Sequence, residues 1–75
     1  MGNDGLHKLN KNIGSVMRKH RKKKGISQAV MGDDINLSSN QVGRIERAQS
    51  NPTIKTLYSI AEYLEIEVVD LVSTK

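Results

Sequence analysis

Hydrophobic residues recur along most of this chain at spacings of three and four, which is the repeat of an amphipathic helix. The first series runs through Leu9, Ile13, Met17 and His20. Gly25 follows it, and glycine readily takes the left-handed conformation that ends a helix. The spacing therefore predicts a first helix over residues 9–24. His20 stands where an apolar residue is expected, and we interpret it as a half-buried packing residue, because no His or Cys partner for a metal or catalytic role lies nearby.

The eight residues before this series have a different composition. They contain two glycines, one asparagine and one aspartate with a single leucine. Such a composition is typical of a chain end that packing does not hold. We predict a flexible N-terminal leader over residues 1–8, with His7 exposed, and one folded domain over residues 9–75.

A second, shorter helix is predicted after Gly25. Ser27 is a favourable N-cap, and the helix should end near Ile35 after about two turns. Gly32 costs about 1 kcal/mol relative to alanine inside a helix, so we expect another helix backbone to pass close to it. Asn36 tolerates the left-handed conformation of a tight turn. The inward side of this helix is predicted to consist of Val30, Met31 and Ile35.

The third helix is the element around which the rest of the chain is organised. Ser38 is a favourable N-cap, so a helix should extend over residues 39–47. Val42 and Ile45, with Leu37 just before the cap, mark its apolar side. The other sides carry short polar groups followed by arginines, namely Ser39, Asn40, Gly43, Arg44 and Arg47.

This polar side is compatible with reading DNA. In the major groove, Asn pairs with adenine and Arg with guanine, and short side chains in the first turn let the backbone approach the bases. A polar outer face that simply contacts water is the alternative interpretation. The surroundings of the helix therefore have to decide between the two.

Two further apolar segments follow the loop at residues 48–52. Thr53 is predicted to cap a fourth helix, with Tyr58 and Tyr63 at the rim of its apolar stripe. The inward residues of that helix are predicted to be Ile54, Leu57, Ile60, Ala61 and Leu64. Residues 67–72 form a shorter apolar piece that either closes the core of the domain or faces a second subunit. No alternation at period two extends over a useful length, so the predicted fold is all-α with four or five helices.

Length and composition exclude several classes of protein. Seventy-five residues form one small core without a substrate-enclosing cleft or a second domain for a small-molecule ligand. The chain has no cysteine, no clustered metal ligands and no glycine-rich phosphate loop, so we predict neither an enzyme nor a cofactor or metal site. It also lacks a signal peptide and any run of about 18 apolar residues, which favours a cytoplasmic protein with no membrane segment.

Charge is distributed unevenly along the chain. Residues 1–47 hold ten Lys and Arg against four Asp and Glu, whereas residues 48–75 hold two against four, for a net charge of +4. A one-sided basic surface suits a polyanion such as nucleic acid. The lysine run at residues 22–24 is equally typical of a solubilising tract. The basic residues that could touch phosphate, if they face the groove, are Lys8, Lys11, Arg18, Lys19 and Lys22 to Lys24.

Several pairs and short motifs at particular separations identify a family resemblance. They are Ile13-Gly14, Arg21 with Gly25-Ile26-Ser27-Gln28, Leu37-Ser38, Ile45-Glu46-Arg47, Asn51-Pro52-Thr53-Ile54, Leu57, Ile60-Ala61 and Leu64. Over residues 13–72 the chain resembles the lambda-repressor-like helix-turn-helix domain, also called the Cro or xenobiotic-response-element type, of phage repressors and small bacterial regulators. The resemblance implies a compact helical fold that binds double-stranded DNA.

The resemblance also implies roles for individual residues. Gln28 is expected to bond a phosphate and to reach a base, and Arg47 with residues 49–51 to lie along the phosphates. Arg21 and Glu46 match an internal salt bridge, so we predict a structural role for both. Base-reading and groove-edge positions are matched by Ser38, Ser39, Asn40 and Arg44. With Gly43 included, the implied DNA-binding set is Gln28, Ser38, Ser39, Asn40, Gly43, Arg44, Arg47 and Asn51.

Four positions depart from the pattern of the family. Alanine is usual at Gly32, glycine at Ala48 and leucine at His20, and these differences bear on local geometry. Gly43 replaces a side chain that often contacts the groove, so base readout here is expected to rest on fewer residues.

Two functional hypotheses follow. The first is a sequence-specific transcriptional regulator that binds a palindromic operator as a homodimer, with two recognition helices about 34 Å apart. The second is an antitoxin-like protein-interaction module with secondary DNA binding. A toxin-neutralising tail would extend beyond the domain, and only residues 73–75 follow the last apolar residue, which favours the first hypothesis. The operator sequence and the direction of regulation stay open.

Overall fold

The computed structural model describes residues 2–73, with side chains from Asp4 onward, and no strand occurs within that range. The predicted all-α fold is confirmed. Its five helices are α1 (Gly2–Lys24), α2 (Gln28–Ile35), α3 (Ser39–Glu46), α4 (Ile54–Leu64) and α5 (Val68–Val72).

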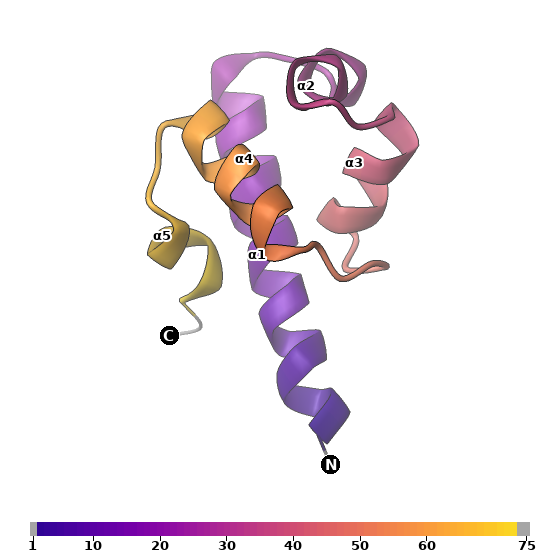
Figure 1. Ribbon diagram of the computed structural model, residues 1–75, viewed down its shortest axis with the longest axis vertical. Helices are drawn as coiled ribbons and strands as arrows, with labels where there is room; N and C mark the ends of the chain where they lie inside the picture. The colour runs from indigo at the N-terminus through magenta and orange to yellow at the C-terminus, as the bar shows by residue number, and fades with distance from the viewer. Residues whose placement is uncertain (1, 74–75) are drawn as a thin grey trace.

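Helix α1 forms the long axis of the molecule. At about 1.5 Å per residue its 23 residues span roughly 34 Å, close to the longest extent of the molecule, 36 Å. Helices α3, α4 and α5 pack against it, and α2 packs against α3 and α4. Figure 1 shows that the N-terminal part of α1 extends past the other helices. The fold thus places α3 on the flank of a continuous central helix.

The start of α1 differs from the prediction. Residues 2–8, expected to be a leader outside the helices, belong to the helix, which begins at Gly2. Asp4 in the first turn complements the helix dipole, and Leu6 continues the apolar series three residues before Leu9. Both features favour the helix, whereas each glycine costs it about 1 kcal/mol. The predicted exposure of His7 is confirmed, and the flexibility of this segment stays a prediction.

The core draws on all five helices. Its fully buried side chains are Ile13, Met17, Met31, Val42, Ile60 and Leu71. His20 is half-buried, as expected. Leu71 closes the core together with the partly buried Val68 and Val72, whereas Val69 on the same helix is 63% exposed. The apolar piece at residues 67–72 therefore serves the domain's own core, apart from Val69.

Two predicted core residues are exposed instead. Val30 is 46% exposed and Ile54 is 71% exposed. Helix α2 has only two turns, so the neighbouring Met31 takes the core position and turns Val30 outward. Ile54 is the first residue of α4 and precedes the point where that helix meets the core.

The predicted helix caps are confirmed. The side chains of Ser27, Ser38 and Thr53 each accept a hydrogen bond from the backbone N–H three residues later, at 3.0, 3.0 and 3.1 Å. Such bonds satisfy donors that the first turn of a helix leaves unpaired. Gly25 and Asn36 take left-handed conformations, with φ of 73° and 66°. The boundaries of α2, α3 and α4 are thus set by local side-chain chemistry.

Two glycines permit close backbone approaches that set the position of α3. A Cβ at Gly32 would lie 2.5 Å from the carbonyl oxygen of Leu37, so the backbone near it belongs to the turn into α3 and not to another helix. A Cβ at Gly14 would lie 2.5 Å from the carbonyl oxygen of Glu46. The end of α3 therefore lies directly on the backbone of α1.

Ala48 leads to a prediction about stability. Its φ is 59°, in the left-handed region that costs an L-residue about 1–2 kcal/mol. Ala48→Gly removes that strain but adds freedom to the unfolded chain. The net gain in the free energy of unfolding should be about 1 kcal/mol. Ala29→Gly, on the exposed side of α2, should instead lose about 1 kcal/mol. Urea denaturation checks both, and a loss at Ala48→Gly would contradict the account.

No helix in the described part of the chain combines the length and apolar character that crossing a bilayer requires.

Candidate nucleic-acid interface

Helix α3 is anchored on one side and open on the other. Val42 and Ile45 are buried in the core, while the N-terminal turn begins with a reciprocal cap. Ser38 Oγ accepts from the backbone N–H of Gln41 at 3.0 Å, and Gln41 Oε1 accepts from the N–H of Ser38 at 2.8 Å. The S-x-x-Q spacing is a recognised signal for this arrangement, and our sequence reasoning missed Gln41. The cap fixes the first turn, leaving the exposed polar face to Ser39, Asn40 and Arg44.

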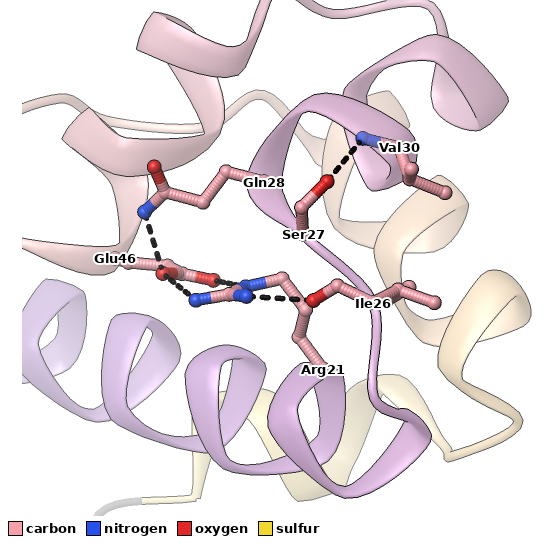
Figure 2. A network of polar contacts seen from close by, with 6 residues as sticks. All are labelled: Arg21, Ile26, Ser27, Gln28, Val30 and Glu46. Carbon is pink, nitrogen blue, oxygen red and sulfur yellow. Dashed lines mark hydrogen bonds and ion pairs between the residues drawn. The ribbon is translucent and has the colours of Figure 1, made fainter.

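A buried ion pair fixes the other end of α3. Arg21 Nε lies 2.7 Å from Glu46 Oε2, and Arg21 Nη2 donates to Glu46 Oε1 at 3.1 Å. The side chains are only 9% and 2% exposed. Arg21 Nη1 also donates to the carbonyl oxygen of Ile26 at 2.8 Å, so one guanidinium joins α1, the turn before α2 and the end of α3 (Figure 2). The predicted internal salt bridge between Arg21 and Glu46 is confirmed.

The electrostatics of this pair favour the charged form of Arg21. By accepting hydrogen bonds from the guanidinium, the Glu46 carboxylate raises the pKa of Arg21. Arginine is charged throughout the pH range in which proteins fold, so the shift adds no pH dependence. The buried Glu46 carboxylate compensates the Arg21 charge within the protein, so this guanidinium is not available to an external anion.

Gln28, the first residue of α2, is held by the same pair. Its Nε2 donates to Glu46 Oε1 at 3.0 Å (Figure 2). The side chain is half-buried, so its position is fixed at the edge of α3. This contact spans 18 positions in the sequence, and no local signal predicts it.

Gly43 lies under two of the predicted contact residues. It is buried, and a Cβ there would lie 2.8 Å from Arg47 Nη1 and 3.3 Å from Gln28 Oε1. Gly43 thus presents no side chain at the outer face of α3, and its place in the implied DNA-binding set stays a prediction. Its lack of a side chain lets Gln28 and Arg47 close over the middle of α3.

The loop after α3 holds the two arginines and ties back to α1. Arg44 Nη2 donates to the carbonyl oxygen of Gln49 at 3.1 Å, and Arg47 Nε donates to Gln49 Oε1 at 3.2 Å. The side-chain oxygen of Asn51 accepts a hydrogen bond from the side chain of Asn10 on α1. Asn10 is only 7% exposed. The side-chain oxygen of Asn51 thus positions the loop. Sequence reasoning missed Asn10, although a polar residue beside the apolar stripe of α1 was a visible signal.

The predicted site residues fall into three groups. Gln28 and Arg47 lie together over Gly43 in the middle of α3, whereas Ser38, Ser39 and Asn40 form its N-cap and first turn. Arg44 and Asn51 line a hollow of about 280 Å³ between α3 and the start of α4. All eight therefore belong to α3 or to the segments that contact it.

Helices α2 and α3 are joined by a tight turn in which Asn36 takes a left-handed conformation. The inner side of α3 is buried in the core and its outer side is polar. This arrangement defines a helix-turn-helix domain. No group of three His, Cys, Asp or Glu side chains within the described residues is arranged to hold a metal ion. The chain matches the helix-turn-helix family over residues 17–71, and it belongs to this family, in its lambda-repressor-like branch.

Relatives support this assignment. An uncharacterised HTH-type transcriptional regulator of Sinorhizobium fredii, y4dJ, is 32% identical over 65 residues, which cover 87% of this chain and 84% of that protein. The P22 c2 repressor, crystallised in complex with a synthetic operator, superimposes with a TM-score of 0.79 at 25% identity over 84% of this chain and 96% of its own. The restriction-modification controller protein C.AhdI of Aeromonas hydrophila superimposes with a TM-score of 0.77 at 31% identity, over 83% of this chain and 94% of its own.

Proposed function

We propose that this chain is a sequence-specific regulator of transcription that binds double-stranded DNA, with α3 in the major groove. The observation that carries the proposal is the outer face of α3. It exposes Ser39 and Asn40 in the first turn and Arg44 one turn later, on a helix that Val42 and Ile45 anchor from beneath. A rigid helix of this kind can bring short polar groups to base edges.

The exposed side chains have suitable chemistry for base readout. An asparagine amide pairs with both the acceptor and the donor of adenine, and an arginine pairs with the two acceptors of guanine. Arg44 donates to one loop carbonyl in the free protein. Because this contact is exposed, exchanging it for a guanine acceptor requires no repacking of the core.

Gln28 and Arg47 suit the phosphate backbone at one edge of the groove. Both lie against Gly43, and Glu46 holds the Gln28 amide in place. Contacts of this kind set the register of a protein on the duplex but carry no sequence information. They would hold α3 at a fixed depth while Asn40 and Arg44 select the site.

We infer a homodimer on a two-fold symmetric operator. One eight-residue helix offers few base contacts, and each is worth only about 1–3 kcal/mol of discrimination. Two copies of α3 about 34 Å apart would read two half-sites on the same side of the duplex. Ile54 and Tyr58, four residues apart on α4, are 71% and 63% exposed and would be covered by a two-fold contact on that helix.

Selection from a pool of random duplexes tests the proposal. The purified protein should enrich a palindromic site whose half-site centres are about 10 base pairs apart. Sedimentation of the complex should show two chains on each duplex. A pool that stays random after repeated selection would contradict the proposal and would direct attention to a protein partner.

Gly43→Ala is expected to separate folding from binding. Alanine favours a helix interior by about 1 kcal/mol over glycine, so thermal stability should hold or rise. The new Cβ displaces the flexible ends of Arg47 and Gln28, so affinity for the selected duplex should fall about tenfold, the equivalent of roughly one net hydrogen bond. Fluorescence anisotropy measures the affinity.

Gly5→Ala is the matched control for this substitution. It also replaces a helical glycine, but a Cβ there would meet no other atom within 4 Å. Gly5→Ala should therefore leave the affinity unchanged. Equal affinities for the two variants would contradict the role given to Gly43.

A further inference from the structure

One face of α1 is basic over three turns and borders the end of α3. Lys11, Ser15, Arg18 and Lys22 follow at spacings of four, three and four, so they share one side of the helix. Together with the neighbouring Lys19 they line a hollow of about 470 Å³, whose other wall is formed by Glu46, Arg47 and Ala48. We name Lys11, Arg18, Lys19, Lys22 and Arg47 the α1 basic face.

The charge of this face is not neutralised within the protein. All five cations are exposed, and neither of the two ion pairs found in the described residues involves any of them. The sole carboxylate that lines the hollow is Glu46. Its side chain is 2% exposed and already paired with Arg21. Clustered cations bordering a low-dielectric wall concentrate a positive potential that attracts anions.

The α1 basic face is continuous with the proposed DNA site. A smaller hollow of about 200 Å³ is lined by Arg18, Gln28 and Arg47, with the Arg21–Glu46 pair. Arg18 and Arg47 thus border both hollows. A DNA backbone that passes Gln28 and Arg47 would therefore reach the basic residues of α1 next.

The length of the face also fits a polymer of phosphates. Lys11 and Lys22 are separated by about 16 Å along the helix axis, at 1.5 Å per residue. One DNA strand carries a phosphate for roughly each 3.4 Å of axial rise. The face is therefore longer than a single anion requires and can contact several successive phosphates of a strand.

We propose that the α1 basic face binds the sugar–phosphate backbone of duplex DNA that flanks the site read by α3. The proposal rests on the function proposed above and adds a second, sequence-independent contact to it. The sequence alone did not distinguish which basic residues could touch phosphate. The geometry does, because Lys8, Lys23 and Lys24 do not line the hollow. Contacts to phosphate carry no sequence information, so this face should govern affinity and salt dependence, and not sequence preference.

Two triple variants with equal charge test the proposal. Lys11→Gln/Lys19→Gln/Lys22→Gln removes three lysines of the face, and Lys8→Gln/Lys23→Gln/Lys55→Gln removes three exposed lysines elsewhere. Lysine and glutamine have similar helix propensities, so both variants should fold, which denaturation curves check. Affinity is measured over a salt series on a duplex that carries the selected site with long flanks.

The variant of the face should lose at least tenfold in affinity at moderate salt while enriching the same site as the wild type. The slope of log affinity against log salt should become shallower by about 5.4 for the proposed homodimer, at roughly 0.9 for each of the six phosphate contacts that its two chains lose. Wild-type protein on a duplex trimmed to the selected site should lose affinity in the same way. The control variant should keep most of the wild-type slope.

Other outcomes would overturn this proposal without touching the first. Equal losses in the two triple variants would show only a general effect of charge. Unchanged binding to duplex with lost binding to single-stranded RNA would assign the face to a different macromolecule. If the wild type itself enriched no site, the proposed function would fail, and this proposal would fail with it.

Discussion

Arg21→Met is expected to lower the free energy of unfolding by about 3–5 kcal/mol, the cost of removing one partner from a buried ion pair. The substitution leaves the Glu46 carboxylate, now 2% exposed, without its countercharge. It also removes the donor to the carbonyl oxygen of Ile26. Small domains are stable by only about 5–15 kcal/mol, so the variant should lose a large part of its stability. Urea denaturation provides the measurement.

Two controls isolate the effect of the buried charge. Lys24→Met removes the exposed partner of Glu65, 3.6 Å away, and should cost no more than about 1 kcal/mol. Adding Glu46→Leu to Arg21→Met should recover part of the loss, because two apolar residues often replace a buried pair without penalty. The account would be wrong if Arg21→Met cost no more than Lys24→Met.

The Asn40→Ala/Arg44→Ala variant is expected to lose discrimination between the selected operator and a scrambled duplex by a factor of about a thousand. Each base contact is worth about 1–3 kcal/mol, and a homodimer makes each contact twice. Weak, salt-sensitive binding should remain, because Gln28, Arg47 and the α1 basic face are intact. Competition at one fixed salt concentration measures the ratio of the two affinities.

Lys55→Ala controls for the lost positive charge. It lies on the exposed side of α4, away from α3, so it should preserve the ratio. Alanine favours a helix, so neither variant should melt its own helix. A double variant that keeps the wild-type ratio would show that the outer face of α3 does not read the site.

Features that depend on local chemistry were predictable from the sequence. Ser27, Ser38 and Thr53 cap helices through bonds that reach only three residues along the chain. Ile13, Met17 and Ile60 were identified as core residues because long helices repeat their apolar stripe often enough to define its direction. The two turns of α2 do not, so the same pattern placed Val30 inward although it is exposed. Ile54 was also placed inward, but it is the first residue of α4 and is exposed because it precedes the part of that helix that meets the core.

The start of α1 and part of the site depended on contacts between distant residues. The first turns of α1 contain glycines that lower helix propensity. The sequence does not show how far the stable remainder of the helix extends its hydrogen bonding into these turns. Asn10 and Asn51 are bonded across 41 positions, and no periodicity connects them. The burial of Gly43 likewise follows from where Gln28 and Arg47 end in space. The family resemblance did anticipate one distant contact, between Arg21 and Glu46.

The central claim is that α3 reads base edges in the major groove. The most direct measurement replaces the guanines and adenines of the selected site, one at a time, with 7-deaza analogues, which remove the N7 acceptor from the major groove and leave the minor groove unchanged. The account predicts losses of about 1–3 kcal/mol at matching positions in both half-sites, and no further loss at those positions in the Asn40→Ala/Arg44→Ala variant. Wild-type affinity unchanged by every such replacement would contradict it.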